Sequence, residues 1–435
     1  MSDSTPQTAC SNALTRPAFA NRIAAVPPTI TFVDVADFRF TTATLSVLLV
    51  LPAVAVLPAT GAGAAPYVRC PAVKPPAPPP AAPTPPPVDP VHRSVGGEAL
   101  ATAGLAVPAG APAAPALTAT SWLVADLTTG EVLGGCAPHE YRTPASVQKL
   151  LLAASLMPRL DPTQMVEVTG ADLRDLDPAS SLMGVVAGGR YSIESLWQGL
   201  LLTSGNDAAN VLARVGGGGA GRAGGVEAMN EEARRLHANQ THAATPSGLD
   251  GPGQYTSAYD LALIARATFA REDFRRYMAT TVARIPAQPR NPAFTITHDN
   301  TLLGRYPGTL GGKTGFTDLA RQTYVGVAER NGRRLAVTLL GAETAPLGSL
   351  GEAAALLNWG FALPPGASVG RLVSPDEKKH DSPVVPVRGE RPATPGEGSI
   401  SLPTGLALGG AVVLAVLMLA FPWRRRGTRQ EAGRR

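Results

Sequence analysis

The sequence predicts an α/β protein of the α+β kind, in which an antiparallel sheet packs against a helical cluster. Strand-like runs stand near both ends of a segment of about 250 residues, a length that one domain can occupy, and helix-like stretches lie between them. Asn331-Gly332, between the last two runs, is a strong hairpin signal. The chain is 44% hydrophobic and 16% charged, so it can bury a sizeable core.

The expected strands form two hairpins. The first joins residues 120–127 to residues 131–133 through a turn at 128–130, and the second joins 322–328 to 334–340. The first and last strands are expected to meet in one sheet, with the helices packed against it.

The expected helices lie between the two hairpins. Residues 147–156 are almost wholly apolar, which predicts a central buried helix. A second helix is expected from the N-cap Ser192 to Leu202, and a third from Asp207 to Val215.

Two apolar segments indicate an exported membrane protein. Residues 402–421 carry no charge and are long enough to span a bilayer, and an Arg-rich tail after them predicts a cytoplasmic C-terminus. Residues 45–57 are shorter and run into a small-residue sequence at 60–65, which is typical of a secretory signal. Because the region before it is unusually long for a signal, two alternatives remain open: the true start lies downstream, near Val33 or Val35, or the segment stays as an uncut anchor. We expect a single-pass protein of the cell membrane whose folded domain is extracytoplasmic.

The chain is expected to divide into six parts. They are an N-terminal extension with the signal or anchor (1–65), a Pro/Ala-rich extracytoplasmic linker (66–115), the folded domain (116–365), a Pro-rich polar linker (366–401), the transmembrane helix (402–421) and a basic cytoplasmic tail (422–435). Cys70 and Cys136 would lie in an oxidising compartment. A disulfide between them is left open, because a long Pro-rich run separates them.

The net charge does not indicate a nucleic-acid partner. The last twelve residues hold six Arg and one Glu, which accounts for the whole +5, and the other 423 residues hold 32 Lys and Arg against 32 Asp and Glu. No nucleic-acid-binding motif accompanies them. None of the six His stands at a recognised chelating spacing from another ligand, so no metal and no other cofactor is expected.

Ser146 and Lys149 are the first candidates for chemistry. They stand three residues apart at the start of an expected helix, so both side chains project from one face. The helix N-terminus favours a developing oxyanion at Ser146. Lys149 can take the hydroxyl proton if burial lowers its pKa.

Two further motifs accompany this pair. Thr203-Ser-Gly-Asn206 places the hydroxyl of Ser204 and the amide of Asn206 on a short polar break between helices. In Gly311-Gly-Lys-Thr-Gly315, the glycines let a ligand lie against an edge strand, with the Lys313 ammonium free to receive a carboxylate. A phosphate-binding loop is excluded, because Pro307 stands where its first glycine is needed and a strand follows in place of a helix.

The motifs S-x-x-K, S-x-N and K-T-G, in this order, resemble the penicillin-recognising serine enzymes, whose fold is β-lactamase/transpeptidase-like. Further segments are similar to the low-molecular-mass D-alanyl-D-alanine carboxypeptidases, over roughly residues 118 to 362; these segments are 126–133, 181–184, 201–209, 247–253 and 256–261. The C-terminal membrane helix and the Pro-rich spacers look like the actinobacterial members of that family.

The resemblance implies a role for each motif residue. Ser146 would be the nucleophile, Lys149 its base, and Ser204 the relay of the proton to the leaving amine. The substrate would be held by Asn206 at the acyl-side amide, by Lys313 and Thr314 at the terminal carboxylate, and by an oxyanion hole of the backbone N–H groups of Ser146 and Phe316, beside Gly315. The implied partners are peptidoglycan stem peptides ending in D-Ala-D-Ala, and β-lactams as covalent inhibitors.

Two departures from the family pattern are expected. The sequence between Phe361 and the membrane segment is too short and too rich in Pro and charge for the β-rich second domain that many relatives carry. The glycine run from Gly216 to Gly225 is expected to be a mobile loop.

Three alternative functions stand beside the carboxypeptidase. A DD-endopeptidase acting on cross-links would use the same residues. A class A β-lactamase would need a Glu in an E-x-x-x-N loop after S-x-N, and none of its candidates, Glu227, Glu231, Glu232 and Glu272, has an Asn at that spacing. A non-catalytic penicillin sensor would need a signalling domain, which a tail of about a dozen residues does not supply.

Overall fold

The structure is a computed structural model that describes residues 67–76, 84–289 and 291–376. The apolar segments 45–57 and 402–421 and the basic tail lie outside the described residues. Within the described ranges, no helix combines the length and the apolar character needed to cross a membrane.

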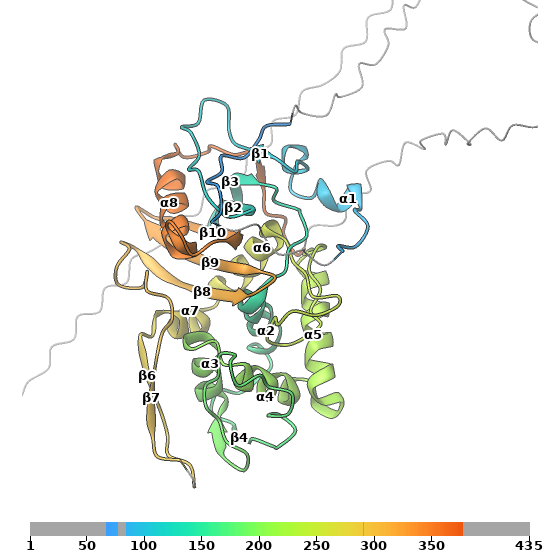
Figure 1. The fold of residues 1–435 in the computed structure, drawn as a ribbon, viewed down its shortest axis with the longest axis vertical. Helices are drawn as coiled ribbons and strands as arrows, with labels where there is room; N and C mark the ends of the chain where they lie inside the picture. The colour runs from blue at the N-terminus through green and yellow to red at the C-terminus, as the bar shows by residue number, and fades with distance from the viewer. Residues whose placement is uncertain (1–66, 77–83, 290, 377–435) are drawn as a thin grey trace, which may run out of the picture. The chain divides into compact units, whose positions relative to one another are not determined.

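One antiparallel sheet organises the domain. Its strand order is β1-β3-β2-β10-β9-β8, and β11 also pairs with β3. The strands are β1 (Leu105–Ala106), β2 (Ser121–Asp126), β3 (Glu131–Cys136), β8 (Thr309–Thr317), β9 (Arg321–Arg330), β10 (Arg333–Ala342) and β11 (Gly370–Arg371). β2 pairs with β10, with Val124 opposite Val337, so both predicted hairpins and the meeting of the first and last strands are confirmed (Figure 1).

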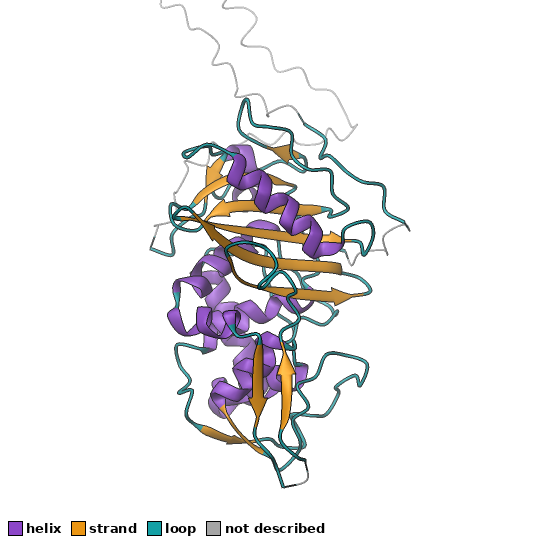
Figure 2. Cartoon of the chain, turned by 90° about the vertical axis from the view of Figure 1, so that its left-hand side faces the viewer, coloured by secondary structure: helices purple, strands orange, loops and turns teal. Residues whose placement is uncertain are grey.

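The two faces of the sheet pack against different helices because successive side chains of a strand alternate between them. Trp122 and Val124 of β2 belong to a core cluster with Leu356 of α8 (Gly348–Ala362). Leu123 belongs to a larger cluster with Leu151 of the central helix α2 (Lys149–Leu156). Figure 2 shows α8 lying across the strands.

The helical cluster covers the second face. It contains α2 (Lys149–Leu156), α3 (Ile193–Leu202), α4 (Asn206–Gly216), α5 (Gly221–Arg235), α6 (Ala258–Ala270) and α7 (Glu272–Ala279). The three predicted helices are confirmed, and the Ser192 Oγ caps α3 by accepting from the N–H of Ser195 at 3.1 Å. The smaller elements are α1 (Pro90–Arg93), β4 (Met165–Glu167) paired with β5 (Arg190–Ser192), and β6 (Val282–Ile285) paired with β7 (Phe294–Thr297).

The expectation of a mobile loop at the glycine run is wrong. α4 ends at Gly216 and α5 begins at Gly221, with a short 3-10 turn between them. A Cβ at Gly225 would collide with the carbonyl oxygen of Ala213, and one at Gly217 would collide with that of Gly221. The glycines therefore allow two helix backbones to approach closely through a tight reversal.

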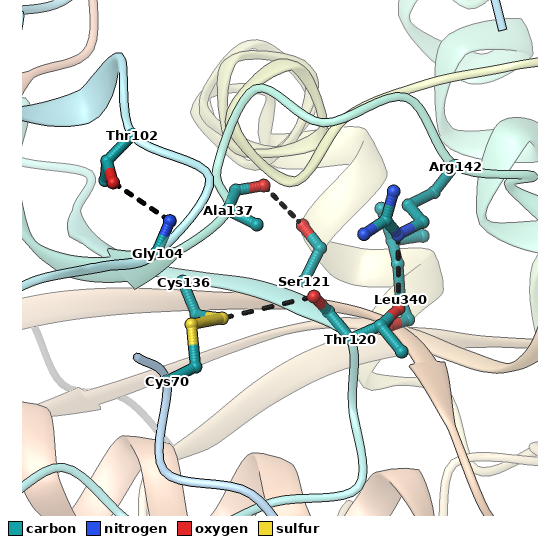
Figure 3. Close-up of a disulfide and its surroundings, with 9 residues drawn as sticks. All are labelled: Cys70, Thr102, Gly104, Thr120, Ser121, Cys136, Ala137, Arg142 and Leu340. Atoms are coloured by element: carbon teal, nitrogen blue, oxygen red, sulfur yellow. Dashed lines mark hydrogen bonds between the residues drawn. A yellow bond between two sulfur atoms is a disulfide. The ribbon is translucent and has the colours of Figure 1, made fainter. Parts of the chain in front are cut away.

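The predicted boundary between linker and domain, at residue 115, is wrong, because much of the segment 66–115 packs on the domain. Leu105, in β1, pairs with Cys136, and Leu100 is fully buried. The N–H of Val73 donates to the Leu117 carbonyl at 2.8 Å. Cys70 and Cys136 form a disulfide, which ties the N-terminal segment to β3 (Figure 3). Backbone pairing and buried apolar side chains supply the contacts that a Pro/Ala composition did not suggest.

The second predicted boundary, at residue 365, is too early. β11 adds to the sheet through Gly370 opposite Val132, and Leu372 is 2% exposed. The domain therefore continues for several residues into the segment predicted as a polar linker.

Candidate active site

The turn that carries Ser146 is held between the sheet and the helices. Residues Ala145–Gln148 form a 3-10 turn, and α2 continues from Lys149. Ala145 is fully buried at a φ of 52°, a conformation that costs a non-glycine residue energy and persists only where packing enforces it. The Thr323 hydroxyl of β9 donates to the Pro144 carbonyl at 2.9 Å. The position of Ser146 is therefore fixed by contacts on both sides.

Lys149 lies at the centre of a buried polar network. Its side chain is fully buried, and its Nζ lies 2.7 Å from the Ser146 Oγ, 2.7 Å from the Asn206 Oδ1 and 2.9 Å from the Ser247 carbonyl oxygen. Burial lowers the pKa of Lys149 well below its ordinary value, and the nearby charge of Lys313 lowers it further.

Three partners surround the Lys149 Nζ, which suits an ammonium with three donors and also a neutral amine with two donors and a lone pair. The amide and carbonyl oxygens can only accept hydrogen bonds, so each takes one N–H of Lys149. A neutral amine then has its lone pair left for the third partner, and the hydroxyl of Ser146 can donate to it. In the neutral form, which the lowered pKa of Lys149 favours, the amine is placed to accept the Ser146 proton.

The S-x-N segment faces the same turn. Ser204 lies between α3 and α4 at a φ of 62°, is 4% exposed, and its Oγ has no hydrogen-bond partner within the described parts of the chain. The N–H of Asn206 donates to the Ser181 carbonyl at 2.9 Å. The structure thus brings Ser146, Lys149, Ser204 and Asn206 together, with the Ser204 hydroxyl free to bond a ligand.

The K-T-G segment lies on β8, which is an edge strand of the sheet as predicted. Its lysine differs from the expectation of a free ammonium: Lys313 is 1% exposed, and its Nζ donates to the Thr314 carbonyl at 2.8 Å. Burial lowers the pKa of Lys313 to about 8, while Asp299 opposes this shift. A Cβ at Gly315 would lie 2.8 Å from the backbone nitrogen of Ser146, so glycine keeps the space in front of that N–H open.

A cleft of about 500 Å³ connects these motifs. Its wall includes Ser146, Ser204, Asn206, Thr314, Gly315 and Phe316, together with residues of the segments 179–181 and 344–350. Phe316 is 55% exposed. Within the described ranges, no group of three His, Cys, Asp or Glu side chains is arranged to hold a metal ion.

Sequence reasoning gave no role to three groups near the cleft. The Ser247 carbonyl holds Lys149, and Asp299 lines the cleft. The Asp207 carboxylate accepts the N–H groups of Met183, Gly184 and Val185 at 2.8 to 3.0 Å, which fixes the segment beside Asn206. Asp207 follows the S-x-N motif directly, which was a usable signal; a backbone carbonyl has no signature in a single sequence.

Comparisons with known proteins point to one family. A family model described as D-alanyl-D-alanine carboxypeptidase matches residues 109–344. The chain is 43% identical over 269 residues to the D-alanyl-D-alanine carboxypeptidase DacB2 of Mycobacterium tuberculosis, covering 61% of this chain and 90% of that protein. It is 37% identical to DacD of Escherichia coli, covering 57% of this chain and 64% of that protein.

Solved structures agree with the sequence matches. A crystal structure of a D-alanyl-D-alanine carboxypeptidase from Mycobacterium tuberculosis superposes with a TM-score of 0.57 at 42% identity, covering 61% of this chain and 99% of that one. The Streptomyces K15 DD-transpeptidase superposes with a TM-score of 0.55 at 26% identity, covering 57% of this chain and 99% of that one.

Proposed function

The chain belongs to the D-alanyl-D-alanine carboxypeptidase family, and we propose that it removes the terminal D-Ala from peptidoglycan stem peptides through an acyl-enzyme on Ser146, thereby limiting cross-linking. The observation that carries this proposal is the 2.7 Å contact between the Ser146 hydroxyl and a fully buried Lys149, whose other two contacts are acceptors only. A serine with its base in place is what acyl transfer requires.

Acylation begins with proton transfer from Ser146 to Lys149. The Ser146 Oγ attacks the carbonyl carbon of the penultimate D-Ala, and the Lys149 amine takes the hydroxyl proton and becomes an ammonium. The developing oxyanion is stabilised by the N–H groups of Ser146 and Phe316. The open space at Gly315 supports this site, because a side chain there would crowd the Ser146 N–H.

Collapse of the tetrahedral intermediate expels the terminal D-Ala. Its amine must gain a proton, and the Ser204 hydroxyl relays one from the Lys149 ammonium. The unpartnered Ser204 Oγ supports this role, because a buried hydroxyl without a partner is costly unless a ligand completes its bonding. Water then hydrolyses the ester on Ser146, with the same groups acting in reverse. A β-lactam would acylate Ser146 in the same way.

The terminal carboxylate binds at the Thr314 end of the cleft. Because Lys313 is buried behind the wall, Thr314, which lines the cleft, would make the direct contact, and the Lys313 ammonium would attract the carboxylate over a short distance. Asn206 would hold the amide on the acyl side through the part of its side chain not bound to Lys149.

The proposed setting is the outer face of the cell membrane. The charge-free segment 402–421 with its Arg-rich tail supports anchoring there, and truncation before Ser401 should release soluble, active enzyme. If the truncated protein still partitions with membranes, the segment 45–57 is the anchor.

A DD-endopeptidase is the second candidate, because the same residues serve cleavage of a cross-link. A class A β-lactamase has less support, because none of its four candidate glutamates is among the described residues that line the cleft. Digestion of purified muropeptides decides between the first two: release of free D-Ala from pentapeptides supports the carboxypeptidase, and conversion of cross-linked dimers to monomers without it supports the endopeptidase.

A further inference from the structure

A carboxylate lines the cleft in which a carboxylate substrate is proposed to bind. Of the described residues that form the cleft wall, Asp299 is the one with a readily ionised side chain. The two lysines of the motifs, Lys149 and Lys313, are 0% and 1% exposed. A ligand that enters the cleft therefore meets a negative group at the surface, and positive groups only beneath it.

Asp299 is fixed close to the motif residues. Its backbone N–H donates to the Leu202 carbonyl at 2.9 Å, which places it beside the loop that carries Ser204. Its side chain is exposed to solvent and interacts electrostatically with both Lys313 and Lys149. Partial enclosure by the cleft wall nevertheless raises the pKa of Asp299 above its ordinary value, although the two cations oppose this shift. The Asp299 carboxylate and the Lys313 ammonium therefore influence the same part of the cleft with opposite charges.

We infer that Asp299 is a specificity-determining residue, whose negative charge weakens the binding of a free terminal carboxylate. It thereby lowers the preference of the enzyme for peptides with a free terminal carboxylate over peptides whose terminal carboxyl is blocked. This inference rests on the proposed function. Like charges in a partly enclosed cleft repel more strongly than in bulk water, because less solvent screens them. A leaving group whose carboxyl is blocked does not experience the repulsion.

The test compares a matched pair of peptides, one ending in D-Ala-D-Ala with a free acid and the other with a C-terminal amide. The full chain is assayed at pH 6.5, below the Lys313 pKa of about 8, and again at pH 5.5, because Asp299 raises that pKa and its removal lowers it. The variants are Asp299→Asn and Asp299→Lys. The control is Asp318→Asn, which removes an exposed carboxylate of the β8–β9 turn that does not line the cleft.

We expect Asp299→Asn to lower the KM for the acid about three- to tenfold, and Asp299→Lys to lower it further. The KM for the amide should change less than about twofold, and added salt should shrink the difference between wild type and variant. Asp318→Asn should behave as wild type. An unchanged ratio of the two KM values in both Asp299 variants overturns the inference. A higher KM for the acid also overturns it, because Asp299 would then assist binding through Lys313.

A second readout separates this inference from the proposed function. A labelled penicillin carries a carboxylate and acylates the protein without any peptide hydrolysis. If the wild type reacts with penicillin but cleaves neither peptide, the proposed carboxypeptidase activity is wrong, and the rate of penicillin acylation still tests Asp299. Asp299→Asn should raise that rate at low penicillin concentration by about threefold or more. An unchanged rate contradicts the inference.

Discussion

The two lysines of the site differ in how completely the protein bonds them. Lys149 is surrounded by the Ser146 hydroxyl, the Asn206 amide and the Ser247 carbonyl. Lys313 has a single hydrogen bond among the described residues, to the Thr314 carbonyl, and the nearby Ser204 hydroxyl has none. If the proposed roles hold, the nucleophile is positioned before substrate binds, and the carboxylate end gains its remaining contacts from the ligand.

Removal of Lys149 should have the largest effect on activity, because Lys149 joins Ser146, Asn206 and Ser247 in one hydrogen-bond network. Lys149→Ala should slow acylation by both peptide and labelled penicillin about 10³-fold or more, since the general base is lost. The measurement is the second-order acylation rate with each reagent. Lys149→Arg is the matched variant: a guanidinium stays charged and cannot accept the proton, so recovery of the rate by Arg would contradict the role of Lys149 as a base.

Gly315→Ala tests the space between the K-T-G strand and the backbone N–H of Ser146. The added methyl group would lie 2.8 Å from the Ser146 nitrogen and would also press on the Thr323 hydroxyl. If that N–H forms part of the oxyanion hole, kcat should fall about 10²-fold. Gly170→Ala serves as the control, because a Cβ at Gly170 would meet no atom within 4 Å. Equal activity of the two variants would remove the Ser146 N–H from the mechanism.

Lys313→Ala tests the end of the cleft that is proposed to bind the terminal carboxylate. Lys313→Ala removes the buried positive charge behind Thr314, and losing ~1.5–3 kcal/mol of attraction for the carboxylate would lower turnover of free-acid peptides roughly ten- to two-hundred-fold. The C-terminal amide of the same peptide is the control. If the variant discriminates acid from amide as strongly as wild type does, another group binds the carboxylate.

The smallest expected effect is the pH dependence of kcat/KM, which distinguishes the contribution of Lys313 from that of Lys149. Burial lowers the pKa of Lys313 to about 8, so raising the pH through this value removes its proton and its positive charge. We expect kcat/KM for the acid peptide to fall about three- to tenfold between pH 7 and 9. The amide should lack this decline. An equal decline with both peptides would assign it to another group.

Much of the fold was predictable because its signals are local. Asn331-Gly332, at φ values of 52° and 76°, forms the turn that the dipeptide favours, and the strands on either side follow from it. The glycine run between α4 and α5 was not predictable from composition. Glycine suits both a flexible loop and a close helix contact, and the choice depends on residues such as Ala213 that approach it only in the folded chain.

The site was predictable at its motif residues, whose types the chemistry demands. The environment of the two lysines was not. The burial of Lys313, the Ser247 carbonyl on Lys149 and the charge of Asp299 in the cleft wall all depend on segments distant in sequence. The packing of residues 67–76 and 84–115 was also missed, because the Cys70–Cys136 disulfide and the β1 pairing connect these segments to β3, which comes later in the chain.

The residue that a labelled penicillin acylates identifies the nucleophile. Wild-type protein, incubated with the label and digested, should carry one adduct on the peptide that contains Ser146, identified by mass spectrometry. Ser146→Ala should carry none, while its thermal unfolding stays close to that of wild type. Labelling that survives in Ser146→Ala, or an adduct on another residue of the wild type, would contradict the assignment of Ser146 as the nucleophile.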